Sequence, residues 1–270
     1  MQPADAYRAC AVIARASGTS FYRGMRLLPK PKRDALFAIY AFARRVDDIA
    51  DDGGEHRLER LEALRRRADA DDPVFAALAD VCARYAMPLD AFDDLIDGAE
   101  MDVRGTTYVT FDQLEAYCRR VAGSIGRLSV GIFGATERDR ALELADELGV
   151  GFQLTNIVRD VAEDLANGRV YLPREDLEAF GVDLERPGEG FAALVRFESE
   201  RAGRWYDQGM ELLPLLDRAS AASVATMASA YRRLLRRIER EPEAVLTRRV
   251  SLPSWEKGWV AARSLVGAAR

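Results

Sequence analysis

The chain has 270 residues, of which 49% are hydrophobic, and a formal net charge of −5. This acidic balance argues against a general nucleic-acid surface, which needs a basic excess. The chain has no run of 18 apolar residues, one histidine and three scattered cysteines, which argues against a membrane-spanning helix and a zinc site.

Nearly every segment has the composition and periodicity of a helix, and Tyr108-Val109-Thr110 is too short to count as a strand. No fixed-period repeat and no linker divides the chain, so we predict one all-α domain spanning residues 1–270. The expected helices span residues 3–16, 21–28, 32–50, 55–69, 73–85, 88–103, 110–133, 137–166, 173–180, 191–216, 218–240 and 254–268.

Two features of the predicted 110–133 helix bear on its structure. Thr110 and Gln113 have the spacing of a capping box, with Thr110 as the N-cap. Gly123 and Gly126 lie inside the helix, where each costs about 1 kcal/mol relative to alanine. We therefore expect these glycines to make room for a neighbouring backbone or a ligand. Tyr117 would place a hydroxyl among apolar residues of the same helix.

Cysteine usage and the N-terminal segment bear on localisation. Three thiols without a CxxC pair are typical of a reducing compartment. Asp5, Arg8 and Arg15 interrupt any signal-peptide core. We therefore expect a cytoplasmic protein, for which peripheral contact with the inner membrane face stays open.

Four aspartates close the predicted 32–50 helix: Asp47, Asp48, Asp51 and Asp52. On a helix Asp47 and Asp51 are one turn apart, about 6 Å along the axis, and share a face with Tyr40 and Arg44. Asp48 and Asp52 point about 100° away. Mg²⁺ prefers oxygen ligands and is usually held by one or two carboxylates plus substrate phosphates. Taken alone, the motif fits a solvated acidic helix end equally well.

A second acidic motif strengthens the prediction of a metal site. Gln153, Asn156, Asp160 and Asp164 fall within about 80° of one another on a helix, and the two aspartates again have four-residue spacing. Arg159 lies at the edge of this face, within reach of a phosphate. Two aspartate pairs on facing helices can hold two or three Mg²⁺ ions around a diphosphate.

Four ordered segments resemble motifs of the squalene/phytoene synthase family of head-to-head prenyl transferases. The resemblance extends along nearly the whole chain. It implies a single-domain class I isoprenoid synthase fold, an all-α helical bundle around a central active-site cavity. The segments are Ser20-Phe21-Tyr22, Tyr40 to Asp52, Tyr117 to Gly126, and Gln153 to Asp164 with Gly168 to Pro173.

The resemblance also implies roles for individual residues. The metal ligands would be Asp47, Asp51, Asn156, Asp160 and Asp164, binding two or three Mg²⁺ ions, with Mn²⁺ as an alternative. The same four aspartates and Tyr117 would form the catalytic group. The implied substrate contacts are Ser20, Phe21, Tyr40, Arg44, Val121, Gln153, Asn156, Arg159, Tyr171, Tyr231 and Arg248.

Within the family, the chain looks most similar to the bacterial presqualene diphosphate synthases of the hopanoid route. The short length, the residues from Arg248 to Pro253 and the residues from Val130 to Gly134 carry this narrower resemblance. It implies condensation of two farnesyl diphosphates to presqualene diphosphate, without NADPH, and downstream enzymes of the squalene pathway as partners.

Other functions share the same motifs. Phytoene synthase, which uses geranylgeranyl diphosphate, and dehydrosqualene or squalene synthase differ in pocket depth or in product, which one sequence does not reveal. A non-enzymatic helical protein that binds divalent cations or prenyl lipids is an alternative of another class. Such a protein would not need Gln153, Asn156, Asp160 and Asp164 on one face.

Overall fold

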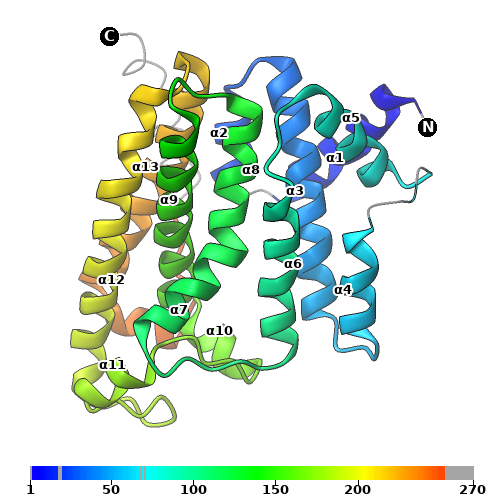
Figure 1. The fold of residues 1–270 in the computed structure, drawn as a ribbon. Coiled ribbons are helices and arrows are strands. Elements are labelled where there is room, and N and C mark those ends of the chain that lie inside the picture. Colours follow the sequence, from blue (N-terminus) through cyan, green and yellow to red (C-terminus); the bar gives the residue numbers. More distant parts are fainter. Residues whose placement is uncertain (1, 18–19, 67–68, 70, 253–270) are drawn as a thin grey trace.

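The computed structural model describes residues 2–17, 20–66, 69 and 71–252, and its regular elements are all helical (Figure 1). The α-helices are α1 (Pro3–Ala16), α2 (Ser20–Met25), α3 (Lys30–Asp51), α4 (Arg57–Arg65), α5 (Pro73–Arg84), α6 (Asp90–Val103), α7 (Phe111–Cys118), α8 (Ser124–Phe133), α9 (Arg138–Arg159), α10 (Val161–Ala166), α11 (Arg174–Ala179), α12 (Gly190–Gly209) and α13 (Arg218–Arg240). The π turn η1 (Arg119–Gly123) joins α7 to α8, and η2 (Met210–Leu215) and η3 (Pro242–Leu246) are 3₁₀ turns.

Helix α3 shows why these segments fold as they do. Ile39, Phe42, Val46 and Ile49 recur at three- and four-residue spacing, and all four are buried. They form the apolar stripe that an amphipathic helix turns toward the core. The ring of Phe42 meets that of Phe92 from α6 edge to face, with ring centroids 5.4 Å apart. Burying this stripe fixes the direction in which the polar face of α3 points.

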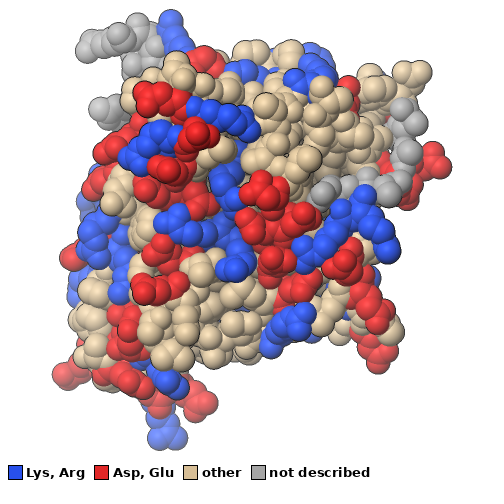
Figure 2. Space-filling view, in the orientation of Figure 1, with Lys and Arg blue, Asp and Glu red and all other residues tan. Residues whose placement is uncertain are grey.

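The long helices run roughly along one axis, with α9 packed between α8 and α12 and α3 packed against α6 and α8 (Figure 1). The loop between α6 and α7 crosses one end of this bundle, where α10 and α11 also lie. No helix within the described residues is both long and apolar enough to span a bilayer. Acidic and basic side chains interleave over the face drawn in Figure 2.

Three predicted helices are divided in the structure. The 110–133 segment contains the π turn η1 between α7 and α8. The 137–166 segment breaks at Asp160, whose φ of −103° and ψ of 13° separate α9 from α10. The 191–216 segment becomes the 3₁₀ turn η2 after Gly209, where Pro214 lacks the N–H that an α-helix requires. The predicted 254–268 helix lies outside the described residues.

The predicted capping box is wrong in detail. The Thr110 side chain caps nothing. Instead the Gln113 side chain accepts a hydrogen bond from the Val109 N–H at 2.7 Å, and the Glu175 carboxylate accepts one from the Phe111 N–H at 2.6 Å. The glycine prediction is confirmed, because a Cβ at Gly126 would collide with the Ala145 carbonyl on α9.

Candidate active site

A cavity of about 430 Å³ opens among helices α2, α3, α6, α8, α9 and α13, a size typical of small-molecule sites. Most of its wall is apolar, with Met25, Leu36, Phe133 and Val224 among the lining residues. The charged lining residues come from α3, α6, α9 and the segments that follow α9, whereas the lining residues from α2, α8 and α13 are uncharged, so the cavity has a charged part and an apolar part. The charged part contains Arg44, Asp47, Asp51, Asp102, Arg159, Asp160 and Arg169.

Most of the sequence-predicted site residues line this one cavity: Phe21, Tyr40, Arg44, Asp47, Asp51, Tyr117, Val121, Gln153, Asn156, Arg159 and Asp160. Asp164 and Tyr171 line a smaller adjoining pocket. Tyr231 is buried behind the wall, with its ring 5.1 Å from that of Phe21. Ser20 begins α2, and its side chain lies outside the described part of the structure.

The first acidic motif divides as the helical spacing predicted. The Asp47 carboxylate lines the cavity and keeps accessible surface there. Partial desolvation by the surrounding protein, together with the charge of the nearby Asp51 carboxylate, raises its pKa to about 7. Asp48 instead pairs with Arg44 at 2.7 Å on the exposed side of α3. Asp52 pairs with Arg60 at 2.5 Å. Arg44 therefore lines the cavity while its guanidinium forms an ion pair with the Asp48 carboxylate. Its contact with a substrate phosphate stays a prediction.

The two aspartates of the second acidic motif keep their helical spacing although the predicted helix breaks between α9 and α10. The Asp164 N–H donates to the Asp160 carbonyl at 2.8 Å, so these two aspartates remain one turn apart. Asp160 accepts hydrogen bonds from Arg159 and pairs with Arg249 at 3.0 Å. Burial and, to a smaller extent, the neighbouring Asp160 charge together raise the pKa of Asp164 to about 7. The two arginines thus neutralise Asp160 while Asp164 has no such partner among the ion pairs of the described residues.

Arg248 points away from this site. It pairs with Glu241 at 2.9 Å and is exposed, and it does not line the cavity. Its neighbour Arg249, which the sequence analysis did not select, pairs with Asp160 of the second acidic motif. Consecutive residues in a non-helical segment point in different directions, and one sequence does not say which of an Arg-Arg pair faces inward.

Two further cavity residues, Asp102 and Arg169, were not predicted. The Asp102 carboxylate accepts hydrogen bonds from the hydroxyls of Tyr117 at 3.0 Å and Tyr171 at 2.8 Å. Burial raises the pKa of Asp102 to about 6, against the lowering effect of these two donors. The rings of Tyr117 and Tyr171 stack with centroids 5.3 Å apart. Asp102 therefore orients both tyrosines that the sequence singled out.

Arg169 connects the segment after the second motif to the first motif. Its guanidinium donates to the Asp51 carboxylate at 2.8 Å and to the Ala50 carbonyl at 3.2 Å. The position follows Gly168 directly, at the end of the motif that carries the family resemblance. This position within the motif was the one feature of the sequence that could have identified Arg169 as a site residue.

The residues present fit a hard divalent cation. The described residues contain no group of three or more His, Cys, Asp or Glu side chains that converges as a complete cage. The metal ligands that the charged part of the cavity can offer are nevertheless all oxygen atoms, the kind that Mg²⁺ and Mn²⁺ prefer. The Oδ1 atom of Asn156 is buried without a hydrogen-bond partner, while its Nδ2 donates to Gln153 at 3.3 Å. A cation shared with substrate phosphates would satisfy this atom and relieve the repulsion between the carboxylates.

Comparisons with known proteins agree with this geometry. Residues 14–256 match the family model described as squalene/phytoene synthase. The phytoene synthase of Mycobacterium tuberculosis is 44% identical over 97% of this chain and 91% of its own length. The presqualene diphosphate synthase of Sinorhizobium fredii is 38% identical, covering 82% and 83%. A solved dehydrosqualene synthase in complex with ligand has a TM-score of 0.91 at 29% identity, covering 99% of this chain and 98% of its own.

Proposed function

Because the chain belongs to the squalene/phytoene synthase family, we propose that it joins two prenyl diphosphates head to head. The observation that carries this proposal is one cavity with a mostly apolar wall, whose charged part holds aspartates of both acidic motifs and several arginines. Such a cavity suits substrates with a long hydrocarbon tail and a diphosphate head. A non-enzymatic lipid-binding protein would have no use for the paired aspartates.

The polar residues divide the work of holding the diphosphates. Asp47, Asp51, Asn156, Asp160 and Asp164 would hold Mg²⁺ together with the substrate phosphates. When bound, Mg²⁺ supplies positive charge that stabilises the departing diphosphate. The surrounding arginines would contact the remaining phosphate oxygens through charge-assisted hydrogen bonds: Arg44, Arg159, Arg169 and Arg249.

The apolar residues would protect the reacting carbons. In one substrate the allylic C–O bond breaks and diphosphate leaves, and the 2,3-double bond of the other substrate attacks the cation. Loss of one proton then closes a cyclopropane and gives a cyclopropyl prenyl diphosphate. The aromatic residues Phe21 and Phe152 in the wall stabilise positive charge and exclude water. The released diphosphate and Tyr117, whose hydroxyl donates to Asp102, are the two candidates for steering the proton loss.

Two prenyl diphosphates, with hydrocarbon tails of 15 and 20 carbons, are candidates for the substrate. The 44% identity to a phytoene synthase over nearly the whole chain favours geranylgeranyl diphosphate, the C20 substrate of such enzymes. Similarity to a presqualene diphosphate synthase and to a dehydrosqualene synthase structure favours farnesyl diphosphate, the C15 substrate expected from the motifs. We rank the C20 substrate first because its relative is more similar over a larger share of the chain.

Product analysis tests both candidates. Purified protein is incubated with Mg²⁺ and either farnesyl or geranylgeranyl diphosphate, with and without NADPH, and products are identified by mass spectrometry. A C40 product from the C20 substrate supports phytoene synthesis, whereas a cyclopropyl C30 diphosphate that persists with NADPH supports presqualene synthesis. Squalene formed with NADPH would contradict the expectation that NADPH is not used. Failure to consume either substrate would leave the non-enzymatic binding protein as the better hypothesis.

Contact with a membrane surface and with downstream enzymes also belongs to the proposal, because the hydrocarbon products are insoluble in water. Flotation of the protein with anionic liposomes tests the membrane contact. Protein that remains wholly in the soluble fraction would count against it.

A further inference from the structure

One turn of π-helix lies in the cavity wall. In η1 the N–H of Ser124 donates to the carbonyl of Arg119, five residues earlier. A π turn accommodates one extra residue in a helix and occurs mostly at functional sites. Tyr117 precedes the turn, Val121 lies in it and Ile125 follows it, and all three line the cavity.

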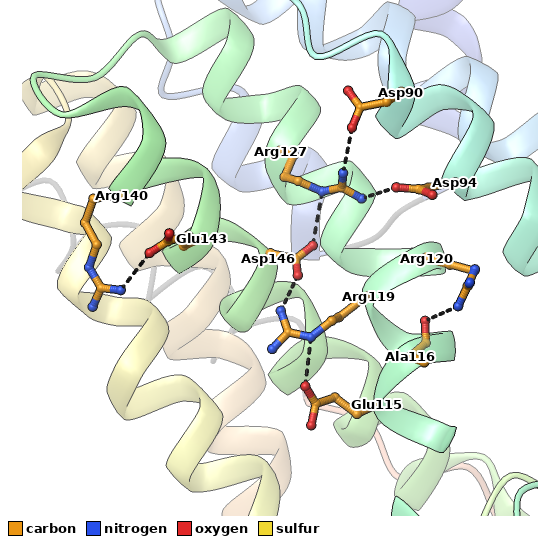
Figure 3. A network of polar contacts seen from close by, with 10 residues as sticks. All are labelled: Asp90, Asp94, Glu115, Ala116, Arg119, Arg120, Arg127, Arg140, Glu143 and Asp146. Carbon is orange, nitrogen blue, oxygen red and sulfur yellow. Dashed lines mark hydrogen bonds and ion pairs between the residues drawn. The ribbon is translucent and has the colours of Figure 1, made fainter. Parts of the chain in front are cut away.

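The π turn also aligns two arginines on the outer side of the same wall. Eight residues of uninterrupted α-helix would leave Arg119 and Arg127 about 80° apart around the axis. With one residue taken up by the π turn, the remaining seven bring the two side chains to within about 20° of each other. Figure 3 shows both guanidinium groups pointing to one carboxylate, that of Asp146 on α9.

Asp146 holds both arginines. It accepts a hydrogen bond from Arg119 Nη1 through one carboxylate oxygen and from Arg127 Nε at 3.1 Å through the other (Figure 3). Its side chain is buried and occupies the space that a Cβ at Gly123 would need, so the carboxylate packs directly on the π turn. The close approach of the Asp146 carboxylate to η1 therefore requires glycine at position 123.

The outer partners of the arginines are more accessible. Arg127 also pairs with Asp94 at 2.7 Å and with Asp90 at 3.4 Å, and these carboxylates are 36% and 75% exposed. Arg119 also pairs with Glu115 at 2.8 Å. Exposed ion pairs contribute little because water and salt screen them. Among the described residues, the buried Asp146 is the one partner that the two arginines share.

The inner side of the π turn reaches the residues around Asp102. A Cβ at Gly98 on α6 would collide with the Val121 side chain, so α6 leaves room for the residue that the π turn pushes inward. One turn later on α6, Asp102 accepts the hydrogen bond from the Tyr117 hydroxyl. A change from π to α register would rotate Tyr117 relative to Val121 and Ile125.

We propose that Asp146 is a positioning residue. By holding Arg119 and Arg127 on one face, it keeps the π turn in place and thereby keeps the Tyr117 hydroxyl on Asp102. The kinetic consequence of this inference rests on the proposed function, but the structural consequence does not.

The structural test is a crystal structure of Asp146→Asn, which keeps the size of the side chain and removes its charge. We expect η1 to lose its five-residue hydrogen bond and the Tyr117 hydroxyl to move out of hydrogen-bond distance from Asp102, which is 3.0 Å in the native protein. Asp94→Asn removes an outer partner and should leave both features unchanged. If Asp146→Asn does not fold, Arg127→Lys weakens the same contact with the charge retained. An unchanged π turn and Tyr117 contact in the folded variant would overturn the proposal.

The kinetic test is a double-mutant cycle with Tyr117→Phe. Asp146→Asn should lower kcat about tenfold with KM within about twofold, and should have little further effect in the Tyr117→Phe background, because residues that act through one another are not additive. A general loss of packing would instead give additive losses and would contradict the inference. If the native enzyme consumes neither substrate, the proposed function fails, and the crystal structure alone decides the role of Asp146.

Discussion

The Arg169 guanidinium lies 2.8 Å from the Asp51 carboxylate and joins the segment after the second acidic motif to the end of α3. This pair places a fixed positive charge beside the predicted metal ligands. We expect Arg169→Gln to lower kcat/KM for the prenyl diphosphate by at least about tenfold, because a charge-assisted contact to phosphate is lost. Steady-state kinetics with saturating Mg²⁺ measure this effect.

Arg60→Gln is the matched control for this prediction. It removes an arginine–aspartate pair that is at least as close, that of Arg60 with Asp52 at 2.5 Å, on the exposed side of the same motif. The control should change kcat/KM by less than about twofold, since exposed pairs contribute little. Equal losses in both variants would show that Arg169 acts only through general surface charge.

The hydrogen bonds to Asp102 predict different effects for two neighbouring tyrosines, Tyr171 and Tyr108. Tyr171→Phe removes a 2.8 Å hydrogen bond and should lower kcat several-fold by freeing the Asp102 carboxylate. Tyr108→Phe is the control, because the Tyr108 hydroxyl is buried without a hydrogen-bond partner. Removing such a hydroxyl should leave kcat unchanged and leave stability unchanged or raised by about 1 kcal/mol. A large loss of kcat in Tyr108→Phe would assign the effect to ring packing instead.

Local pattern and tertiary contact explain what the sequence could predict. The spacing of Asp47 and Asp51, and the apolar stripe of α3, are properties of one helix, so both were predictable. Asp102 was not, because it lies in an acid-rich helix and only its contact with Tyr117 and Tyr171 distinguishes it. The π turn likewise depends on Asp146, which lies on another helix. The pattern of residues within the turn's own segment therefore could not predict it.

The two aspartates of each motif that face inward should control metal-dependent stability. We expect Mg²⁺ with inorganic pyrophosphate to raise the Tm of the native protein, because a ligand that binds only the folded state stabilises it. The increase should be lost when Asp47→Asn and Asp164→Asn are combined. Thermal unfolding followed by circular dichroism measures it, and a chelator should abolish both the increase and turnover.

Asp48→Asn combined with Asp52→Asn is the matched control. These residues belong to the same motif but do not line the cavity themselves: Asp48 pairs with Arg44 and Asp52 pairs with Arg60. The control should keep the Mg²⁺-dependent rise in Tm. If this variant also lost the Mg²⁺-dependent rise in Tm, cation binding would depend on the charge of the whole acidic segment and not on the aspartates that face the cavity.

The apolar end of the cavity should set the length of the substrate. Phe133 lies sixteen residues beyond Tyr117 along α7, η1 and α8, about 24 Å at helical rise, and both residues line the cavity. Phe133→Ala should therefore increase kcat/KM for the longer prenyl diphosphate relative to the shorter one. Competition between C15 and C20 substrates, with product analysis, measures the ratio.

Ile132→Ala controls for the stability lost with a large buried side chain, about 2–5 kcal/mol in this class of change. Ile132 is buried next to Phe133 but does not line the cavity. Its substitution should lower Tm without changing the preference between substrates. A shift of equal size in both variants would exclude Phe133 as the end of the cavity.

A buried ion cluster away from the cavity predicts how stability depends on pH. Arg201 pairs with Asp176 at 2.7 Å and with Glu198 at 2.8 Å, and the Glu198 side chain is 1% exposed. Burial raises the pKa of Glu198 to about 8, and the Asp176 charge adds to the rise while Arg201 opposes it. The folded state therefore favours protonated Glu198, whereas the unfolded chain ionises near pH 4.5.

This difference means that the contribution of Glu198 to stability is greatest below pH 4.5 and is lost as the pH rises through about 8. Glu198→Gln mimics the protonated form and should remove this dependence. Between pH 5.5 and pH 8.5 we expect the native Tm to fall by at least about 2 °C more than that of the variant, since 1 kcal/mol corresponds to about 2–4 °C at this size. Glu200→Gln, an exposed change on the same helix, should follow the native curve. A native curve that is parallel to that of Glu198→Gln across this range would show that Arg201 keeps Glu198 ionised in the folded protein.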